Sequence, residues 1–227
     1  MEEVQRRAQC ASERYEGLLQ VIDAKGKVTE KRWRYDRIGS PGSSKVLLRF
    51  TAPAEVKGLA LLVFHYPDRP ADQWMWTPAL QRNRRITLQD RSARFYGTDF
   101  SYEDVEEPGV DQFDYASLGD ATLGGEPCWR VQAKPRKTRA SQYTALLLWV
   151  RKQNYVIARA DSYTGDQLVR RLKCDAVERV QGIWTARLME ISDLRRGGRT
   201  LLRLDKLQYN LPMTDDEFTL EALRRGK

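Results

Sequence analysis

The sequence predicts a mainly β protein whose antiparallel sheet curls into an incomplete, unclosed barrel or half-barrel. Three observations predict this fold class. About ten strand-like runs follow one another at regular spacing. Short turn signals such as Gly124-Gly125 and Gly197-Gly198 separate them, and helix-like patterns are confined to the start, the middle and a stretch near the end. Strands joined by short turns are antiparallel neighbours, so we expect a meandering sheet.

An N-terminal helix is predicted over residues 2–14, because Val4, Ala8 and Ala11 recur at helical spacing in a polar stretch without Gly or Pro. From there the hydrophobic period changes to two, which is typical of strands. A Gly26 turn joins the first two strands into a hairpin. The predicted strands of the first half cover residues 16–23, 28–38, 45–51, 58–66, 73–76 and 84–88.

Residues 95–108 read FYGTDFSYEDVEEP and carry five carboxylates. Ser101 and Asp104 have the spacing of a capping box, in which hydroxyl and carboxylate each satisfy a free backbone amide. Pro108 ends the segment. The pattern predicts a short, capped helix over residues 99–106, with aromatic side chains packed beneath it.

Strand-like runs resume after this segment. No change of composition, linker or fixed repeat divides the chain, so residues 1–227 are predicted to form a single domain. The predicted strands of the second half cover residues 110–118, 128–133, 143–151, 156–163, 168–177, 183–194 and 199–211.

Two strands are apolar on both faces. In residues 58–66 (GLALLVFHY) and 145–150 (ALLLWV), apolar side chains occupy both alternating sets, so something must cover each side of the sheet. A helix could cover one side and an internal cavity the other; a plainly filled core is the alternative. Trp74 and Trp76 point the same way in their strand and are candidates for a cavity lining or for the core.

The charge favours anionic partners. The formal net charge is +8 and the pI about 9.5, which suits nucleic acid, acidic lipid headgroups or an acidic protein surface. Residues 134–139 (KPRKTR) form a basic loop, and three arginines follow Trp74 and Trp76. Because no nucleic-acid-binding motif accompanies them, solvated surface charge is favoured and no nucleic-acid partner is predicted.

The sequence contains few of the residues and motifs that are typical of enzymes. His65 is the one histidine and lies in the most apolar strand, and there is no G-x-S-x-G, Walker loop or G-x-G-x-x-G motif. Cys10, Cys128 and Cys174 are too scattered for a disulfide framework or a zinc site. We therefore predict no catalytic residue, no metal and no cofactor.

Three segments of the chain resemble the outer-membrane lipoprotein-sorting protein family of bacteria, which includes proteins similar to LolA and LolB. They are FTAPAEVKGLALL (residues 50–62), QWMWTPALQRNRRI (residues 73–86) and YGTDFSYEDV (residues 96–105), the last being the most specific, with Thr98 where Ser is more usual. The resemblance implies an incomplete barrel closed by helices, with an apolar cavity that shelters acyl chains in the periplasm. The segment 99–106 would then belong to a lid, and its carboxylates would be structural.

The resemblance also bears on localisation and role. The N-terminus lacks the apolar region of a secretion signal, and no apolar run approaches the roughly 20 residues of a membrane-spanning helix. The protein could be cytosolic or the mature form of an exported protein. The resemblance favours the mature form, located in the periplasm. It implies a carrier or acceptor of lipoprotein acyl chains or a lipid; the alternative is a non-catalytic periplasmic interaction subunit of an inner-membrane lipid exporter.

Two sets of site residues follow. An acyl chain gains roughly 0.8 kcal/mol per buried CH₂, so a cavity needs only apolar, adaptable side chains. The predicted cavity residues are Leu48, Phe50, Leu61, Val63, Trp74, Trp76, Phe95 and Phe100. The predicted contact surface for a membrane or an anionic partner consists of Arg82, Arg84, Arg85, Lys134, Arg136, Lys137 and Arg139.

Overall fold

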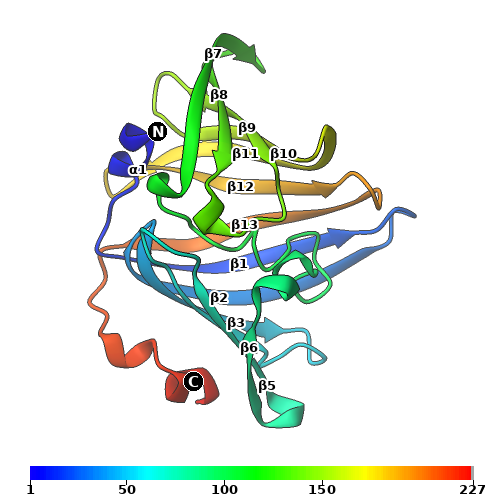
Figure 1. Ribbon diagram of the computed structural model, residues 1–227. Coiled ribbons are helices and arrows are strands. Elements are labelled where there is room, and N and C mark those ends of the chain that lie inside the picture. Colours follow the sequence, from blue (N-terminus) through cyan, green and yellow to red (C-terminus); the bar gives the residue numbers. More distant parts are fainter. Residues whose placement is uncertain (226–227) are drawn as a thin grey trace.

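The computed structural model describes residues 1–225 and contains one antiparallel sheet of thirteen strands (Figure 1). The predicted fold class, a mainly β, unclosed half-barrel with a few short helices, is confirmed. The strands are β1 (Ser12–Ile22), β2 (Val28–Ser40), β3 (Ser43–Ala52), β4 (Ala60–Phe64), β5 (Asp72–Thr77), β6 (Arg82–Ile86), β7 (Phe113–Leu123), β8 (Glu126–Pro135), β9 (Ala145–Arg151), β10 (Ile157–Thr164), β11 (Gln167–Val180), β12 (Ile183–Asp193) and β13 (Gly198–Tyr209).

The sheet is a meander whose two edges are consecutive in the chain. Its order is β6-β5-β4-β3-β2-β1-β13-β12-β11-β10-β9-β8-β7, so β1 pairs with β13 in the middle and β6 and β7 are the edges. Residues 87–112, which we call the strap, connect these two edge strands. Figure 1 shows the strap lying across the curled sheet. We call the face toward the strap the inner face and the opposite one the outer face.

Seven short helices complete the structure of the described residues. Two are α-helices, α1 (Glu2–Arg7) and α2 (Leu220–Arg224); the others are the 3₁₀ turns η1 (Pro78–Leu80), η2 (Leu88–Ser92), η3 (Val110–Gln112), η4 (Lys137–Arg139) and η5 (Asp215–Glu217). Among residues 1–225, none of these helices has the length and apolarity needed to cross a bilayer.

The two-sided apolar strand β4 is covered on both sides. Leu61 and Val63 join the main core between the sheet and the strap, while Ala60 and Leu62 pack on the outer face against Phe218 and the helix α2. Arg49 holds this helix in place, because its guanidinium donates to the carbonyl oxygens of Ala222 and Leu223 at 3.1 and 3.0 Å. The expected coverage of both faces therefore comes from the strap on one side and the C-terminal segment on the other.

The N-terminal helix is shorter than the predicted residues 2–14. It ends at Arg7, and β1 begins at Ser12. Residues 12–14 lie at the start of a central strand that pairs with β2, and Glu13 and Arg14 also pair with β13. A helix this short is marginal on its own, so ladder hydrogen bonds on both sides outweigh the helical spacing of the alanines.

The predicted helix over residues 99–106 is wrong, although its capping pair is present. The Ser101 hydroxyl accepts from the Asp104 amide at 3.2 Å, and the Asp104 carboxylate accepts from the Ser101 amide at 2.7 Å. The chain nevertheless makes only 3₁₀-type turns, in which the amides of Asp104 and Glu106 donate to the carbonyls three residues earlier. A regular helix would fix the directions of its successive carboxylates. Here each carboxylate instead reaches a different arginine of the surrounding structure, as described next.

Candidate functional site

The acidic run of the strap is held by buried arginines. All four guanidinium groups come from outside residues 95–108, three of them from outside the strap, and their side chains are at most 6% exposed. Charged hydrogen bonds of this kind are short and directional, so together they fix the strap against the inner face. The pairs are Glu103 with Arg139 (3.5 Å), Asp104 with Arg170, Glu106 with Arg91 (3.0 Å) and Glu107 with Arg37 (3.3 Å).

Burial and ion pairing shift the pKa values of two neighbouring carboxyls in opposite directions. Burial raises the pKa of Glu106 to about 7, although Arg91 and Arg139 counteract it. Glu107 is also desolvated, but the Arg37 charge and the hydrogen bond from the Tyr35 hydroxyl hold its pKa below the usual value. Glu106 is therefore more easily protonated near neutral pH than Glu107, which remains an anionic anchor of the strap.

His65 connects β4 to the strap and has no free ring nitrogen. Its Nε2 accepts a hydrogen bond from the backbone N–H of Glu107 at 3.0 Å, and its Nδ1 lies 3.0 Å from the Ser44 hydroxyl. Because Nε2 is an acceptor, the neutral ring carries its proton on Nδ1. Burial lowers the pKa of His65 to about 4, so the ring is neutral at physiological pH. The histidine positions the strap.

One enclosed pocket lies between the strap and the inner face of β9–β12. Its volume is about 150 Å³. Its apolar wall comes from Phe100 and Pro108 of the strap, Phe113 of β7 and the sheet residues Leu146, Ala160, Leu172 and Ile191; its polar wall holds Arg139, Tyr143, Ser162, Arg170 and the strap carboxylates Glu103, Asp104 and Glu106. Ligand pockets usually exceed about 300 Å³, so this pocket is too small to hold an acyl chain as it stands.

The structure brings six of the eight predicted cavity residues together on the inner side. Five of them, Leu48, Phe50, Leu61, Val63 and Phe95, are at most 3% exposed and form the packed core beneath the strap. Phe100 is 6% exposed and also borders the pocket. In this state the strap's own aromatic side chains fill the space that the sequence analysis assigned to a hollow.

Trp74 and Trp76 lie on the outer face instead. Trp74 pairs across the strands with Leu62, and Trp76 with Ala60, so both tryptophans share the face that α2 covers. Residues opposite each other on neighbouring antiparallel strands point to the same side. The sequence analysis placed both tryptophans with Leu61 and Val63, which is a register error of one residue.

The predicted cationic surface is divided between two places. Arg82, Arg84 and Arg85 are exposed on the edge strand β6, where Arg84 pairs with Asp90 and Arg85 with Asp72. Lys134, Arg136 and Lys137 are exposed at the end of β8 and in the following turn. Arg139 is buried against Glu103 and belongs to the attachment of the strap.

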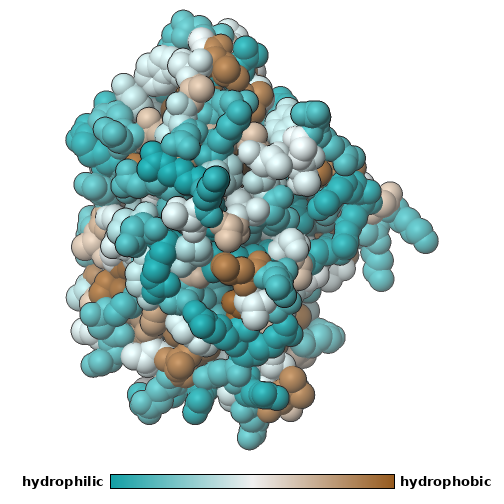
Figure 2. Space-filling view, viewed as in Figure 1, coloured by the Kyte–Doolittle hydropathy of each residue, from teal (hydrophilic) through white to brown (hydrophobic). Residues whose placement is uncertain are grey.

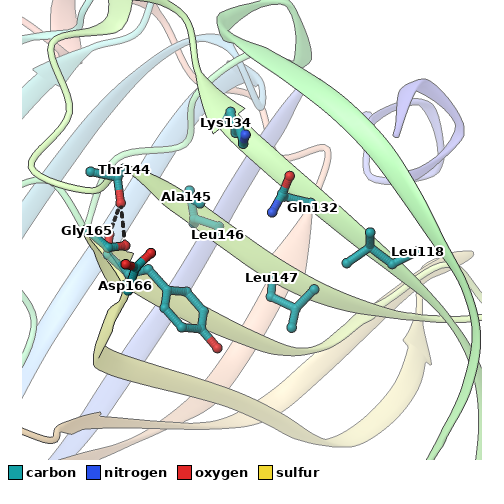
Figure 3. Close-up of a pocket in the computed structure, with 10 residues that line it drawn as sticks. Leu118, Gln132, Lys134, Thr144, Ala145, Leu146, Leu147, Gly165 and Asp166 are labelled. Atoms are coloured by element: carbon teal, nitrogen blue, oxygen red, sulfur yellow. Dashed lines mark hydrogen bonds between the residues drawn. The ribbon is translucent and has the colours of Figure 1, made fainter.

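A second, open groove lies on the outer face of β7–β10 (Figure 3). Its volume is about 590 Å³, and Leu118, Gln132, Lys134 and Leu147 line it. At one end the Thr144 hydroxyl donates to the carbonyls of Tyr163 and Gly165. The groove is larger than the enclosed pocket, but its mixed polar lining and open side suit an acyl chain less well.

Sequence reasoning missed the arginines that hold the strap. Arg37 and Arg170 lie on the inner faces of β2 and β11. A signal was present: Arg37 is in phase with Trp33 and Tyr35, on the apolar side of its strand. A charged side chain in an apolar row needs a buried partner, and the acidic run was the obvious source of one.

The fold and the strap together can be compared with known proteins. A family model described as an uncharacterized, DUF1329-like protein matches residues 42–225. The chain belongs to this DUF1329-like family. A comparison with curated proteins finds no match.

Solved structures place the DUF1329-like chain in the LolA-like fold. A DUF1329 family protein from Desulfovibrio piger has a TM-score of 0.93 at 29% identity, covering 98% of this chain and 95% of that chain. A putative outer membrane lipoprotein-sorting protein domain from Vibrio parahaemolyticus gives 0.93 at 23% identity, covering 99% and 96%. A LolA superfamily protein from Nitrosomonas europaea gives 0.76 at 16%, covering 97% and 98%. The resemblance noted in the sequence is confirmed for the fold.

Proposed function

We propose that this protein is a periplasmic carrier or acceptor that holds lipoprotein acyl chains or a lipid on the inner face of its sheet. It passes them between membranes or partner proteins without catalysis. The observation that supports this most is an apolar inner face roofed by a strap that belongs to no strand of the described chain. The similarity in fold to the lipoprotein-sorting domain agrees with it.

The apolar surface available to a ligand extends beyond the packed core. The inner side of β8–β12 carries a row of apolar side chains, of which Val131, Leu146, Leu172 and Met189 are only partly buried. With the strap displaced, this row and the core residues beneath Phe95 would form one continuous surface. Such a surface fits a flexible acyl chain better than a rigid polar metabolite.

The energetics allow an acyl chain to displace part of the strap. Burying about 14 methylene groups gains on the order of 10 kcal/mol. Breaking a buried ion pair by removing a partner costs about 3–5 kcal/mol, so the gain is comparable with opening one or two of the four pairs and not all of them. An acyl chain that opens only part of the strap, with the freed charges gaining water in exchange, can compete with the aromatic side chains that now occupy the site.

The proposal that the protein acts without catalysis is supported by the hydrogen bonds and ion pairs of its buried titratable groups. Both nitrogens of His65 are engaged in hydrogen bonds, and the strap carboxylates are bonded to arginines. Glu106, whose pKa is raised to about 7, is itself held by the Arg91 guanidinium and the Gln73 side-chain amide. Binding and release by burial of apolar surface then account for the proposed activity.

A second function is favoured by one observation. The enclosed pocket is only about 150 Å³, and the core beneath the strap is filled. A protein that stays closed would instead serve as a non-catalytic periplasmic interaction subunit of an inner-membrane lipid exporter. The two functions differ in whether the strap moves.

A reversible tether of the strap tests the proposal. Asp99 of the strap and Thr200 of β13 are in side-chain contact, with Thr200 Oγ1 2.8 Å from the Asp99 carboxylate. The variant Asp99→Cys/Thr200→Cys, with Cys10, Cys128 and Cys174 replaced by Ala, would lock the strap when oxidised. We expect native mass spectrometry with an added acylated peptide to detect a complex for the reduced protein and none for the oxidised one.

The controls are the same variant with only one new cysteine and the cysteine-free protein, whose loading should not respond to oxidation. Equal loading of the reduced and the oxidised double variant would contradict acyl binding under the strap. Absence of loading in every form, combined with tight binding to an exporter, would favour the interaction subunit.

A further inference from the structure

The hairpin turns at one end of the sheet form two adjacent pairs. In an antiparallel meander, alternate connections lie at the same end. The turns β1–β2 and β12–β13 are adjacent, because a Cβ built on Gly197 would lie 3.5 Å from the Cβ of Ala24. The connections β3–β4 and β5–β6 are adjacent as well, through Gly58 and the ring of Pro78. Figure 1 shows the β1–β2 and β12–β13 tips projecting at the right and the β5–β6 tip at the bottom; we call these four connections the hairpin end.

Large apolar side chains are exposed at three of these tips. Leu80 of η1 is 72% exposed, Val28 at the start of β2 is 52% exposed, and Leu194 directly after β12 is 45% exposed. Elsewhere, hydrophilic residues cover most of the side seen in Figure 2, with hydrophobic residues in small separate patches. A single exposed leucine needs no explanation, but apolar residues on neighbouring projecting turns indicate a contact surface.

Cations surround these apolar tips. Lys25 and Lys27 lie in the β1–β2 turn, Lys57 in the β3–β4 connection, and Arg195 and Arg196 in the β12–β13 turn, all of them exposed. The nearest acid of the β1–β2 turn is used locally, since the Asp23 carboxylate accepts from the backbone amides of Lys25 and Lys27. Asp193 lies 4.0 Å from Arg195 and 3.9 Å from Arg196, which is long for an ion pair, and the two arginine side chains remain 47% and 60% exposed.

The opposite end of the sheet is different. There, Glu3 of α1 bonds to both Arg6 and Arg7, so the charges of the N-terminal helix are paired internally. Trp184 is exposed beside the β11–β12 turn, where the exposed Arg179 guanidinium donates to the Gly182 carbonyl at 3.0 Å. At the hairpin end, by contrast, two adjacent turns each carry an exposed apolar residue and two exposed cations.

Part of the lining of the enclosed pocket comes from residues near this same end. Ile191 of β12 lines the pocket, and Leu194 at the tip is three residues further along the chain. At about 3.3 Å per residue the two are roughly 10 Å apart. Arg170 and Leu172, which also line the pocket, lie in the first half of β11, toward the hairpin end.

We infer that the hairpin end docks on an anionic lipid surface through the adjacent β1–β2 and β12–β13 turns, with Val28 and Leu194 entering the interface and the cations of these turns, Lys25, Lys27, Arg195 and Arg196, contacting headgroups. Lysine and arginine place their charges at the headgroups while their stems stay in apolar surroundings. This orientation puts the strand ends that contribute to the pocket near the membrane from which, or to which, an acyl chain would pass. That last consequence rests on the proposed carrier function; the docking itself does not.

Vesicle flotation tests the docking. The probe is phosphatidylglycerol mixed with phosphatidylcholine, compared with phosphatidylcholine alone. Each cation removed from an anionic membrane surface should weaken partitioning by about fivefold. We expect Lys25→Glu/Lys27→Glu and Val28→Ser/Leu194→Ser each to reduce flotation with the mixed vesicles, and added salt to reduce it for the wild-type protein.

Matched controls are Trp184→Ser, an exposed apolar residue at the opposite end, and Lys206→Glu, a cation 75% exposed on β13. Both should float like the wild-type protein. The inference is overturned if the wild-type protein does not float with anionic vesicles, or if the control variants lose as much as the hairpin-end variants.

Acyl loading, measured on the same variants by native mass spectrometry, separates the two proposals. Hairpin-end variants that fail to float but still load an acylated peptide in solution support docking by this end and leave the carrier function standing. A protein that floats normally but loads nothing retains the docking surface and contradicts the carrier function.

Discussion

The Asp104 carboxylate in the strap is bonded to the Arg170 guanidinium in β11, and these side chains are only 11% and 3% exposed. Arg170 also lies 3.6 Å from Asp193 and 3.0 Å from the Tyr143 hydroxyl. One arginine therefore neutralises an acid of the strap and an acid of the sheet. Removing the arginine and removing the strap acid should therefore change the free energy of unfolding differently.

Arg170→Met should lower the free energy of unfolding by about 3–5 kcal/mol, because it leaves two buried carboxylates without their cation. Adding Asp104→Asn to it should recover part of the loss. The measurement is urea unfolding followed by tryptophan fluorescence. As a control, Arg203→Met removes an exposed pair with Asp205 and should cost less than about 1 kcal/mol. Equal losses for the two arginine variants would contradict the buried role of Arg170.

Glu106 should make stability depend on pH. Burial raises its pKa from 4.5 in the unfolded chain to about 7 in the native state. The native state then holds a proton that the unfolded state has released, so this contribution is complete below the unfolded pKa and is lost as the pH rises through the native pKa. Between about pH 5 and about pH 8 the loss is on the order of 3 kcal/mol.

Glu106→Gln should flatten this dependence, since an amide does not titrate. Unfolding free energies of the wild-type protein and the variant, measured at both pH values, give the difference directly. An unchanged pH dependence in the variant would show that Glu106 is ionised in the native state throughout.

His65 should stay neutral to well below pH 6. Burial lowers its pKa from 6.5 to about 4, so its contribution to stability is present above the unfolded pKa and is lost as the pH falls through the native one. Because it is the only histidine, NMR of the imidazole nitrogens needs no assignment. We expect a protonated Nδ1 and an unprotonated Nε2; titration near the ordinary pKa would contradict the hydrogen bond from Glu107.

Gly17 should tolerate no side chain. A Cβ at this position would lie 2.1 Å from Nε1 of Trp33, on the neighbouring strand β2. Gly17→Ala should destabilise the protein by roughly 1–3 kcal/mol through overpacking and should change the fluorescence of Trp33. Gly109→Ala is the matched control, since its nearest neighbour would be at an ordinary 3.5 Å. Thermal unfolding of both variants measures the expected difference in stability.

The fold could be predicted from the sequence because strand periodicity and turn residues act locally. Residues such as Gly26 and Gly197 adopt positive φ at the turns, and that requirement is visible in the sequence. The spacing of Ser101 and Asp104 also predicted their mutual hydrogen bonds. These are interactions between residues close in the chain.

The features that could not be predicted depend on long-range pairing. Trp74 faces outward because it pairs with Leu62, and nothing within either strand fixes that register. The strap is not helical because its acids reach Arg139 and Arg170, which lie far along the chain. The filled state of the inner face likewise depends on where the strap's Phe95 and Phe100 come to rest.

The most direct test of the account is quenching of Trp33 by a brominated acyl chain. Trp33 is 2% exposed and packs against Phe95 of the strap, whereas Trp74 lies on the outer face. In proteins that keep a single tryptophan, with Phe at the other five positions, an acyl chain that enters beneath the strap should strongly quench Trp33 and leave Trp74 bright. Quenching of Trp74 alone, or of neither while the brominated chain is bound, would contradict binding on the inner face.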